Sequence, residues 1–567
     1  MNIFEIYKNS FNKIIFDHFK EIDKNITFSV DVPKNKNFGD IAYNAPLVLS
    51  SILKENPIDI ANKIKKEFDK IFSEFESVEV AKPGFLNIKF KKFFLVSSLS
   101  KIHKNFGFNN HDNQRKINIE FVSANPTGPL HVGHCRGSIF GDVLGNLLSA
   151  TGNDVTKEYY INDYGNQIIL FIKSVYFRIL EIKKKKKFPD NEGLYPGEYI
   201  IDIAKEVLKS LENINLDNFE DSYNSLEKAS INVAMKIIKS DLESMGIQHD
   251  IFVSEQEIVK KKLLDKAIQI LKKNNNIYHG TLPKPKGDVE DWEPREQLLF
   301  KSTNFGDDSD RALQKSDGSW TYFANDIAYH YDKLNRNYDE YINILGADHA
   351  GYIKRIKSAT SAMNPKKKFT IKVSQIVKLF KSGKPFRMSK RAGDFILAKD
   401  LIETVGKDAA RFMMIFRSSQ SPLDFDIDVV TDKSKENPIF YVQYASARLN
   451  SLFNKSKLNI EDDLSAPESL KLNHESEINL IKKILEWPKI INLSLQHLEV
   501  HFIPYYLYEL VSEFHSYWNL GKMNDEMKIL ENEDQEIKIS RLFLLQKLYF
   551  VIKNGLFILG IKPTKQM

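Results

Sequence analysis

Two histidines stand three residues apart in a chain that has 13 histidines in all. They are His131 and His134 of NPTGPLHVGHCRGSIFGD, which runs from residue 125 to 142. A loop rich in proline and glycine precedes them, and an apolar pattern of helical spacing follows. N–H groups at a helix start attract anions, imidazoles add further donors, and Gly133 lets a ligand approach the backbone. Two capping or surface histidines are the alternative, but this context favours a phosphate site.

A second cationic element lies far downstream, in KSGKPFRMSKRAGDF. After a turn at Ser382 and Gly383, it consists of Arg387, Met388, Ser389, Lys390 and Arg391. Three cations on a loop beyond a sheet suit a departing polyphosphate. A basic loop alone is usually only solvated. Because this loop follows the histidine pair in the same chain, the two elements together favour a nucleotide site.

The chain has a single cysteine, Cys135, which lies between His134 and Arg136. One cysteine cannot form an internal disulfide, and a thiolate zinc cluster is excluded. The thiol could act as a nucleophile, but a small packing residue on a helix is the favoured interpretation.

Composition places the chain among ordinary globular proteins. Its 567 residues are 42% hydrophobic and 28% charged, and this length predicts roughly two to four domains. No apolar run is long enough to cross a bilayer, and the N-terminal segment carries Glu5, Asp17 and Glu21, unlike an acid-poor transit peptide. We therefore expect a cytoplasmic protein without a membrane partner. The net charge of +6 permits a polyanionic partner without requiring one, and the lysine run at 183–187 is best interpreted as a solvated loop.

The elements that must position the histidines form a βαβ unit. Residues 116–122 predict a strand, 123–130 a loop, and the following stretch a helix that ends at Gly152. DVTKEYYIND is the next expected strand, and YINILGADH and FTIKVSQIVKLF supply more. This order predicts a parallel, doubly wound sheet over residues 111–417, with a helical insertion at about 171–273.

Two further units flank the predicted sheet domain. Residues 1–110 open with a helix and end with the strand pair ESVEVAKPGFLNIKF, broken at Pro83 and Gly84, so we expect a small α+β module. Residues 418–567 have Asn437 as an N-cap and Pro438 at the first helical position, followed by one helical pattern after another. A C-terminal helical bundle is the prediction.

His-x-Gly-His followed far downstream by Arg-Met-Ser-Lys resembles the signature of class I aminoacyl-tRNA synthetases. More closely, the chain resembles the bacterial-type arginyl-tRNA synthetases. The matching stretches include EFVSANPTGPLHVGHCRGSIFGD, INDYGNQI, GADHAGYI, RMSKRAG and NPIFYVQYASARL. GDIAYNAPLVL, KPGFLN and NGLFILGI match near the two ends. The resemblance covers nearly the whole chain in order and spacing.

This resemblance implies a Rossmann-like catalytic domain between a module that binds the tRNA D-loop and an all-helical anticodon-binding domain. It implies that L-arginine is activated with ATP and Mg²⁺ to arginyl-adenylate and pyrophosphate, then transferred to the 3′-terminal adenosine of tRNA(Arg). We expect a monomer without zinc. A pocket built around a guanidinium also explains why no large editing domain is visible, because a wrong amino acid would leave buried charges unpaired.

The resemblance also implies roles for individual residues. The catalytic residues are His131, His134 and Lys390. The ATP-binding residues are His131, Gly133, His134, Gly346, Asp348, Arg387, Met388, Ser389 and Lys390. The arginine-binding residues are Glu120, Ser123, Asn125, Tyr322, Asp326 and His349, the last standing where many relatives have glutamine. The tRNA-binding residues are Phe85, Asn87, Tyr441, Tyr444, Arg448 and Met567. Carboxylates suit a guanidinium fork, and Tyr322 and Asp326 share one face if their segment is helical.

Three other functions deserve comparison. A nucleotidyltransferase with a small acceptor would use the same phosphate chemistry but would not need two flanking RNA-binding units. Another class I synthetase is possible in principle, although the cysteine enzyme requires zinc-ligating cysteines that this chain lacks. A non-catalytic RNA-binding relative is disfavoured because His131, His134 and Lys390 are all present.

Overall fold

The computed structural model describes residues 1–108, 114–190, 193–211, 214–283, 295–386 and 396–567. The chain divides into two compact units, one made of Met1–Asn109 with Lys433–Met567 and the other of Asn110–Asp432. The N-terminal module thus folds together with the C-terminal helices, and the chain between them forms a unit of its own. The expected domain boundaries near residues 110 and 417 stay a prediction.

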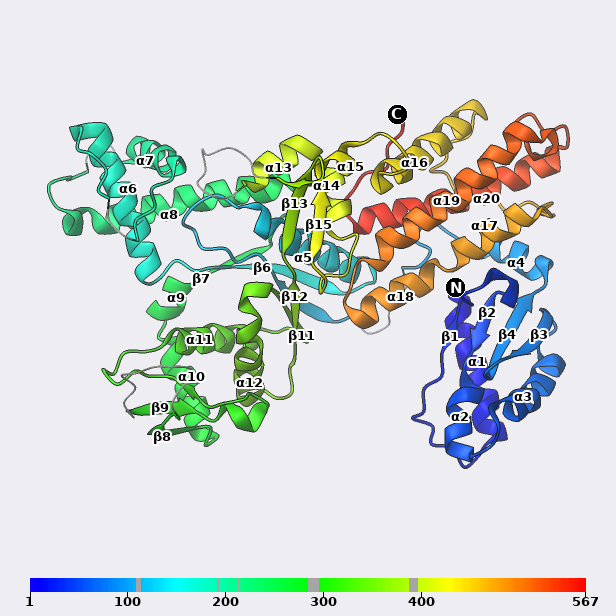
Figure 1. The fold of residues 1–567 in the computed structure, drawn as a ribbon, viewed down its shortest axis with the longest axis horizontal. Coiled ribbons are helices and arrows are strands. Elements are labelled where there is room, and N and C mark those ends of the chain that lie inside the picture. The colour runs from blue at the N-terminus through cyan, green and yellow to red at the C-terminus, as the bar shows by residue number, and fades with distance from the viewer. Residues whose placement is uncertain (109–113, 191–192, 212–213, 284–294, 387–395) are drawn as a thin grey trace. The chain divides into compact units, whose positions relative to one another are not determined.

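The centre of the second unit is a five-stranded sheet, with strand order β12-β11-β5-β6-β7. All four strand pairs are parallel, which confirms the predicted fold class. The strands are β5 (Lys116–Glu120), β6 (Asp154–Ile161), β7 (Ile251–Ser254), β11 (Glu340–Gly346) and β12 (Lys368–Ser374) (Figure 1). Four of the five residues of β5 and the first five of β11 are buried, as expected for central strands covered on both faces.

Helix α5 (Val132–Ala150) connects β5 to β6, so the predicted βαβ unit is present. The helix lies very close to the chain that leaves β5, because a Cβ at Gly141 would stand 2.2 Å from the ring of Phe121. Only glycine permits this approach. The middle of α5 is therefore packed directly against the residue that follows β5.

The helical insertion is shorter than the sequence predicts. Helices α6 (Asn166–Lys184), α7 (Glu198–Ser210) and α8 (Phe219–Ser244) form a hydrophobic cluster of their own. The residues that follow form β7, an edge strand of the central sheet, inside the stretch expected to be inserted helix. Four half-buried residues give too short a pattern to be recognised as a strand.

The remaining elements of this unit surround the sheet. FTIKVSQIVKLF forms two strands, since β12 ends at Ser374 and β13 belongs to another sheet, of order β14-β13-β15. The sequence did not indicate the antiparallel sheet β10-β9-β8. The strands are β8 (Ile277–Thr281), β9 (Glu296–Phe300), β10 (Arg311–Ala312), β13 (Val377–Lys381), β14 (Lys384–Pro385) and β15 (Leu423–Asp426). The helices are α9 (Glu255–Lys260), α10 (Leu263–Lys273), α11 (Tyr322–Leu334), α12 (Ile353–Met363), α13 (Ala398–Val405), α14 (Lys407–Met414) and α15 (Ile427–Thr431).

The first unit combines an antiparallel sheet of order β1-β2-β4-β3 with helices from both ends of the chain. Its N-terminal elements are α1 (Ile3–His18), β1 (Val30–Asp31), β2 (Ile41–Tyr43), α2 (Ala45–Leu53), α3 (Pro57–Ile71), β3 (Phe75–Ala81), β4 (Phe85–Phe90) and α4 (Lys92–Ser98). Its C-terminal helices are α16 (Pro438–Lys455), α17 (Glu475–Leu485), α18 (Trp487–His497), α19 (Phe502–Met523) and α20 (Gln535–Ile558). The predicted C-terminal helical domain is therefore present.

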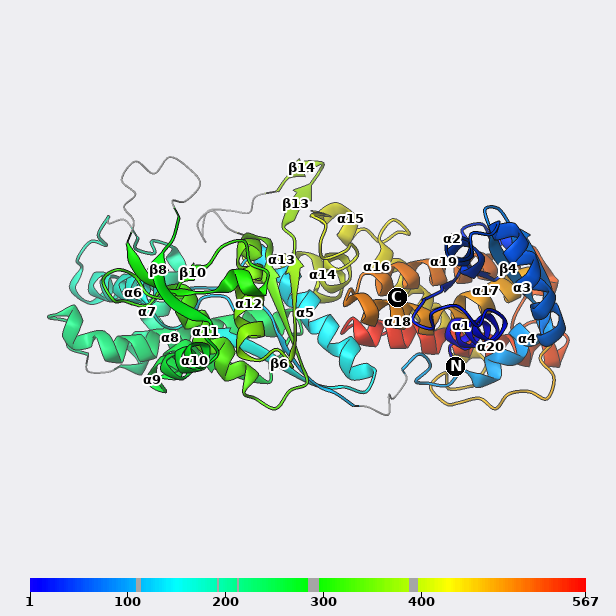
Figure 2. The same cartoon turned by 90° about the horizontal axis from the view of Figure 1, so that it is seen from below.

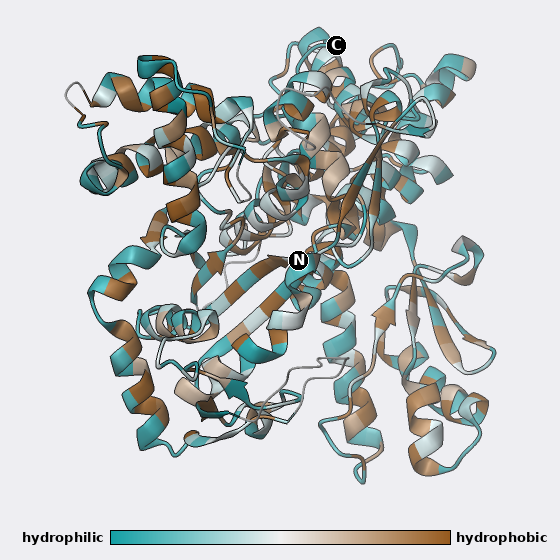
Figure 3. Cartoon of the chain, turned by 60° about the vertical axis from the view of Figure 1, so that its left-hand side comes forward, coloured by the Kyte–Doolittle hydropathy of each residue, from teal (hydrophilic) through white to brown (hydrophobic). Residues whose placement is uncertain are grey.

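The two ends of the chain share one core. Helix α4 lies beside α17 in both views of the fold (Figures 1 and 2). The buried Trp487 indole donates a hydrogen bond of 2.9 Å to the carbonyl of Phe106, and Lys482 pairs with the nearly inaccessible carboxylate of Asp40 over 2.6 Å. Helices of both units alternate hydrophobic and hydrophilic bands (Figure 3). Within the described residues, no helix combines the length and apolarity needed to span a membrane.

Candidate active site

The two histidines hold each other at the start of α5. His131 is the N-cap, and its Nδ1 accepts a hydrogen bond of 3.1 Å from the N–H of Gly133. The Nδ1 of His134 accepts one of 3.2 Å from the N–H of His131. Because both Nδ1 atoms are acceptors, each neutral ring carries its proton on Nε2. A Cβ at Gly133 would lie 2.8 Å from the His131 ring, so glycine is needed for this arrangement.

Both imidazoles are neutral near pH 7. Burial lowers the pKa of His131, and burial together with the charge of His131 lowers the pKa of His134 to about 4, against the opposing effect of Asp348. Neutral Nε2–H groups can donate hydrogen bonds but add no full charge. The pair therefore suits the oxygens of a phosphate better than it suits acid–base chemistry.

The strand next to β5 brings further predicted residues to the same sheet edge. Strand β11 pairs with β5 and ends at Gly346, and Asp348 follows in the short helix η4 (Ala347–Tyr352). Asp348 is close enough to influence both histidines electrostatically. His349 is exposed and lies 3.4 Å from Asp348. Gly346 and Asp348, which are predicted to bind ATP, thus lie at the carboxyl ends of the parallel strands, as the histidine pair does.

The residues that follow the basic loop lie beside the histidine segment. Arg387, Met388, Ser389 and Lys390 lie outside the described residues. The chain that follows them pairs directly with the histidine segment: Val132 N–H donates to the carbonyl of Ile396 over 2.9 Å, and Ala398 N–H donates to that of Leu130 over 2.8 Å. Residues 396–398, which follow the predicted loop, are therefore anchored at the N-terminus of α5.

Carboxylates gather where the parallel strands end. Glu120 ends β5, Asp163 follows β6, and Glu255 opens α9 directly after β7. Asp326 joins them from α11. Burial, then the charges of Glu255 and Glu120, raise the pKa of Asp326 to about 7, and burial with Asp163 raises the pKa of Glu255 to about 7. Acids that raise one another's pKa favour a cationic ligand.

Glu255 is absent from the sequence prediction. Its position follows from β7, which was expected to be part of an inserted helix. A strand assignment there would have placed Glu255 at the carboxyl end of a parallel strand, where ligands of open α/β sheets bind. The Nδ2 of Asn325 donates to Glu255 over 3.3 Å.

The loop after β5 carries two more of the predicted arginine-binding residues, Ser123 and Asn125. Ser123 donates to Glu120 Oε1 over 3.1 Å and accepts from the N–H of Tyr160 over 3.0 Å. Val122 and Ser123 both have positive φ, of 71° and 42°, and a β-branched residue there is strained. Asn125 bonds to the side chains of Asn162 and Gln167. This loop therefore holds Glu120 and Ser123 together in a fixed, strained turn.

Helix α11 confirms that Tyr322 and Asp326 share a helical face. Tyr322 is 70% exposed at the first turn, whereas Asp326 lies four residues further into the helix, among the acids. The structure brings together Glu120, Ser123 and Asp326, whereas the Tyr322 side chain lies at the surface.

Cys135 is fully buried, and its thiol lies 3.8 Å from the carbonyl of His131. Burial and then Asp241 raise the pKa of this thiol to about 12. A protonated, buried thiol is no nucleophile, so the packing role expected from the sequence fits the structure.

The first unit holds a separate cavity of about 750 Å³. Among its lining residues are Tyr444, Arg448 and Met567. The Arg448 guanidinium lies 4.4 Å from the ring centre of Tyr444 and 5.0 Å from that of Trp518. The sequence analysis missed Trp518, and also the lysines at this cavity, which are Lys455, Lys522, Lys528 and Lys565. Aromatic rings interleaved with cations are typical of sites for single-stranded nucleic acid.

Three predicted tRNA-binding residues lie outside this cavity. Tyr441 packs 4.2 Å from the ring of His515 and does not line the cavity. Phe85 is half-buried at the start of β4. Asn87 is 6% exposed in the same strand, which pairs on both sides, with β2 and β3. The Asn87 amide therefore has little exposed surface with which to contact a base, whereas the half-buried Phe85 ring has more exposed surface.

Comparison with known proteins finds matches along nearly the whole chain. Three family models match: "Arginyl tRNA synthetase N terminal domain" at residues 5–90, "tRNA synthetases class I (R), catalytic domain" at 96–421, and "DALR anticodon binding domain" at 442–567. An arginine–tRNA ligase of Pelagibacter ubique is 51% identical over 582 residues, and one of Bartonella quintana is 42% identical over 588, each match covering 100% of both chains.

Solved structures agree. A putative arginyl-tRNA synthetase of Campylobacter jejuni superposes with a TM-score of 0.73 at 32% identity, covering 84% of this chain and 100% of that one. The arginyl-tRNA synthetase of Thermus thermophilus has a TM-score of 0.76 at 19% identity, covering 99% and 100%, which shows a shared fold.

Proposed function

The chain belongs to the class I arginyl-tRNA synthetases, and from this premise we propose the chemistry by which it acts as an arginine–tRNA ligase. It activates L-arginine with ATP and transfers the arginyl group to the 3′-terminal adenosine of tRNA(Arg). The observation that supports this best is that two sites lie together at the carboxyl ends of the parallel strands. A pair of neutral imidazole donors suits a phosphate, and a cluster of buried acids suits a cation.

In the first step, a carboxylate oxygen of arginine attacks the α-phosphorus of ATP. A P–O bond to arginine forms and the bond to the bridging oxygen breaks, which releases pyrophosphate and arginyl-adenylate. The carboxylate is already ionised at neutral pH, so no general base is needed. The Nε2–H groups of His131 and His134 donate to phosphate oxygens as charge builds in the transition state.

The basic loop holds the leaving pyrophosphate. Arg387, Ser389 and Lys390 contact its oxygens alongside the Mg²⁺ that accompanies ATP and supplies positive charge there. Met388 belongs to the same loop, and Gly346 and Asp348 bind the nucleotide from the end of β11. The hydrogen bonds that anchor 396–398 to 130–132 support this role, because they set one end of the loop beside the histidines.

The arginine pocket reads the two cationic ends of the substrate separately. The guanidinium lies at the far end of the substrate side chain, where the carboxylates of Glu120 and Asp326 receive its fork, with Glu255 beside them. Ser123 and Asn125 are the polar groups for the α-ammonium and the carboxylate. Tyr322 and His349 complete the site.

In the second step, a hydroxyl of the terminal ribose of tRNA attacks the activated carbonyl, at the 2′ position by class I analogy, and AMP leaves. Phe85 of the module at residues 1–110 contacts the D-loop, and the buried Asn87 in the same strand contributes mainly by supporting it. Tyr441, Tyr444, Arg448 and Met567 of the helical domain at 418–567 contact the anticodon loop. Stacking on aromatic rings that reach the surface suits the splayed bases of such loops. We further propose a cytoplasmic monomer that requires no zinc.

Aminoacylation of tRNA with each amino acid in turn tests this function. Unfractionated tRNA, ATP and Mg²⁺ are supplied, and acid-precipitable radioactivity is measured. We expect arginine to be charged and the others, including lysine, to remain at background, because lysine cannot fill a bidentate guanidinium site. Charging of a different amino acid would contradict the assignment, and so would ATP-dependent transfer of AMP to a small acceptor without tRNA charging.

A further inference from the structure

Arg448, at the cavity of the helical domain, is held by two neutral groups. Its Nη1 donates a hydrogen bond of 3.1 Å to Nδ1 of His515 in α19, and its Nη2 donates one of 2.6 Å to the hydroxyl of Tyr444. Among the described residues that line the cavity, Glu531 is the sole acid, and it pairs with Lys528 over 3.2 Å. Arg448 is therefore fixed in place while its positive charge stays uncompensated.

The contacts of His515 define its tautomer. Arginine has only donors, so Nδ1 of His515 is the acceptor and the proton of the neutral ring lies on Nε2. Nε2 lies 3.3 Å from the carbonyl oxygen of Tyr441 and donates to it. The His515 side chain is 3% exposed, and its ring centre lies 4.2 Å from that of Tyr441. Because α16 occupies both ring nitrogens, His515 has no donor or acceptor left for a ligand and can act only through Arg448.

His515 is neutral at physiological pH. Burial lowers the pKa of His515 to about 4, and the charge of Arg448 acts in the same direction, against the hydrogen bond to Tyr441. A neutral imidazole orients a guanidinium without forming an ion pair, whereas a carboxylate in the same place would neutralise it. An uncompensated cation costs less to keep where an electron-rich partner is to be bound.

The guanidinium of Arg448 keeps donors for such a partner. It has five N–H donors, and His515 and Tyr444 take two of them. Its centre lies 4.4 Å from the ring centre of Tyr444 and 5.0 Å from that of Trp518. A base that stacks on these rings brings its own edge and its phosphates within reach of the remaining donors.

We propose that His515 is a positioning residue for RNA binding, which holds Arg448 as an oriented and uncompensated cation so that its guanidinium meets an oxygen of the anticodon loop. This inference rests on the function proposed above. The oxygen belongs to a phosphate or to the edge of a base, and both are acceptors for a guanidinium. Without the contact to His515, the Arg448 side chain regains rotamer freedom, which RNA binding must then remove.

The test compares an uncharged and a charged acceptor of the same shape. In His515→Asn the amide oxygen can take the place of Nδ1, and in His515→Asp a carboxylate oxygen takes it. Filter binding of labelled tRNA(Arg) to the full-length protein gives the dissociation constant. We expect His515→Asn to stay within about threefold of the unmodified protein. The constant for His515→Asp should be about 10- to 100-fold higher than for His515→Asn, as for loss of a hydrogen bond to a charged group.

A purely structural role of His515 predicts a different order. An aspartate would hold Arg448 at least as firmly as an asparagine does, because their contact would be an ion pair. Ser516→Asn and Ser516→Asp, at the exposed neighbour outside the cavity lining, control for the effect of an added negative charge alone. These two variants should bind tRNA within about twofold of each other, since exposed charges are screened by salt.

A further variant keeps the test decisive if the substitutions at His515 prevent folding. Tyr444→Phe removes the hydroxyl that accepts from Arg448 and keeps the ring, at a position that is 37% exposed. It should raise the dissociation constant for tRNA by about 3- to 10-fold, the net worth of one hydrogen bond. Arginine binding, in the other unit of the chain, should be the same in every variant.

The dependence of affinity on salt identifies the oxygen. If Arg448 meets a phosphate, the slope of log affinity against log salt concentration should be less steep by about 0.7 for His515→Asp than for His515→Asn. An equal slope together with the expected loss of affinity assigns the oxygen to a base edge.

Equal affinity of the asparagine and aspartate variants for tRNA would overturn the proposal, and so would tighter binding by His515→Asp. Binding by Tyr444→Phe equal to that of the unmodified protein would overturn it as well. If the unmodified protein bound no tRNA(Arg), the proposed function itself would fail.

Discussion

The backbone N–H of His131 donates to Nδ1 of His134 over 3.2 Å, and this contact determines which nitrogen of His134 can serve a ligand. With Nδ1 occupied, Nε2 carries the proton and becomes the donor. His134 is therefore both part of the helix cap and part of the phosphate site. The two roles can be separated by substitution.

We expect His134→Asn to retain the cap and lose the phosphate donor. The amide oxygen of asparagine can take the place of Nδ1, but no atom reaches the position of Nε2. Adenylate formation should fall by about 100- to 1000-fold, as for other preorganised donors, with little change in melting temperature. His134→Gln, whose amide reaches the position of Nε2, should retain more activity. ATP–pyrophosphate exchange measures both. Equal activity of the two variants would contradict the assignment.

Arginine binding should depend on pH through Asp326 and Glu255. Burial and neighbouring acids raise the pKa of each to about 7, so both carry protons at lower pH and are ionised at higher pH. A guanidinium prefers the ionised forms, which means affinity should rise as pH increases from about 5.5 to 7.5 and then level off. Binding near pH 7 should release protons.

Calorimetry in buffers of different ionisation enthalpy measures this release. Asp326→Asn should weaken arginine binding by about 100-fold or more, since a buried charged pair is lost, and should reduce the number of protons released. ATP binding should be nearly unaffected. A pH-independent affinity for arginine would show that the two acids do not bind the guanidinium.

Arg136, two residues after His134, should be essential to stability. Its guanidinium donates five hydrogen bonds to backbone carbonyls, those of Gln375, Met414, Arg417, Ser418 and Ser421. It thereby joins α5 to the segments around β13 and β15. Lysine has three donors and cannot reach them all. Arg136→Lys should lower the free energy of unfolding by roughly 2–5 kcal/mol, from two or more unpaired buried carbonyls.

Urea denaturation measures the change in the free energy of unfolding. Arg417→Lys, at an exposed side chain nearby, serves as the control and should stay within about 0.5 kcal/mol of the unmodified protein. If Arg136→Lys were equally mild, the five hydrogen bonds would contribute little net stability, and another contact would have to hold this region together.

The central βαβ unit could be predicted because several local signals coincide there. An apolar strand, a proline- and glycine-rich loop and a helix with a recognisable start agree with each other, and the ligand site of such a sheet lies at that loop. The helical spacing of Tyr322 and Asp326 was equally informative, since α11 places them on one face. These features depend on short stretches of chain.

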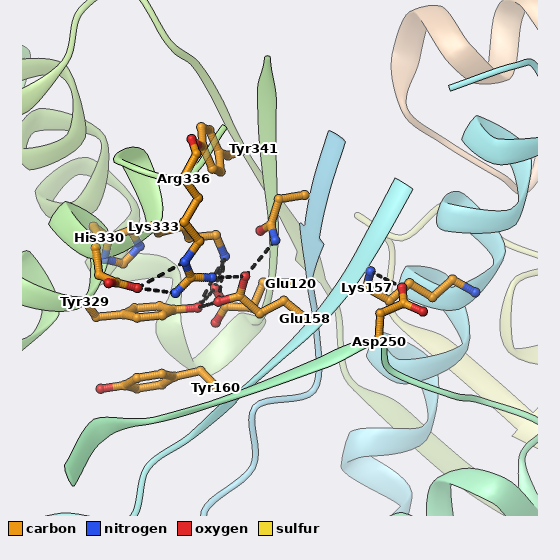
Figure 4. A network of polar contacts seen from close by, with 12 residues as sticks. Glu120, Lys157, Glu158, Tyr160, Asp250, Tyr329, His330, Lys333, Arg336 and Tyr341 are labelled. Carbon is orange, nitrogen blue, oxygen red and sulfur yellow. Dashed lines mark hydrogen bonds and ion pairs between the residues drawn. The ribbon is translucent and has the colours of Figure 1, made fainter. Parts of the chain in front are cut away.

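Other features depend on pairing between distant segments. Strand β7 has only four residues and becomes a strand by pairing with β6, so Glu255 behind it could not be assigned. Lys333 looks like an ordinary helical surface lysine in sequence, and its burial follows from its ion pairs with Glu120 and Glu158 of the sheet (Figure 4). The burial of Asn87 likewise results from strand pairing on both sides of β4.

Trp518 should contribute to tRNA binding. Its ring lines the same cavity of the helical domain as Tyr444, and the Arg448 guanidinium lies close to both rings. A base entering the cavity can stack on such a surface, and each stacked base contributes about 1–3 kcal/mol. We therefore expect Trp518→Ala to raise the dissociation constant for tRNA by about 5- to 150-fold, while Trp518→Phe has a smaller effect.

Filter binding of labelled tRNA measures the affinity. Tyr505→Ala removes a partly exposed ring from the same helix, away from the cavity, and should leave the affinity unchanged. Because the cavity lies in the other unit from the arginine site, Trp518→Ala should leave arginine binding as it is. If Trp518→Ala and Tyr505→Ala bound tRNA with the same affinity, the cavity would not be the tRNA contact. The proposed roles of Tyr444, Arg448 and Met567 would then also be wrong.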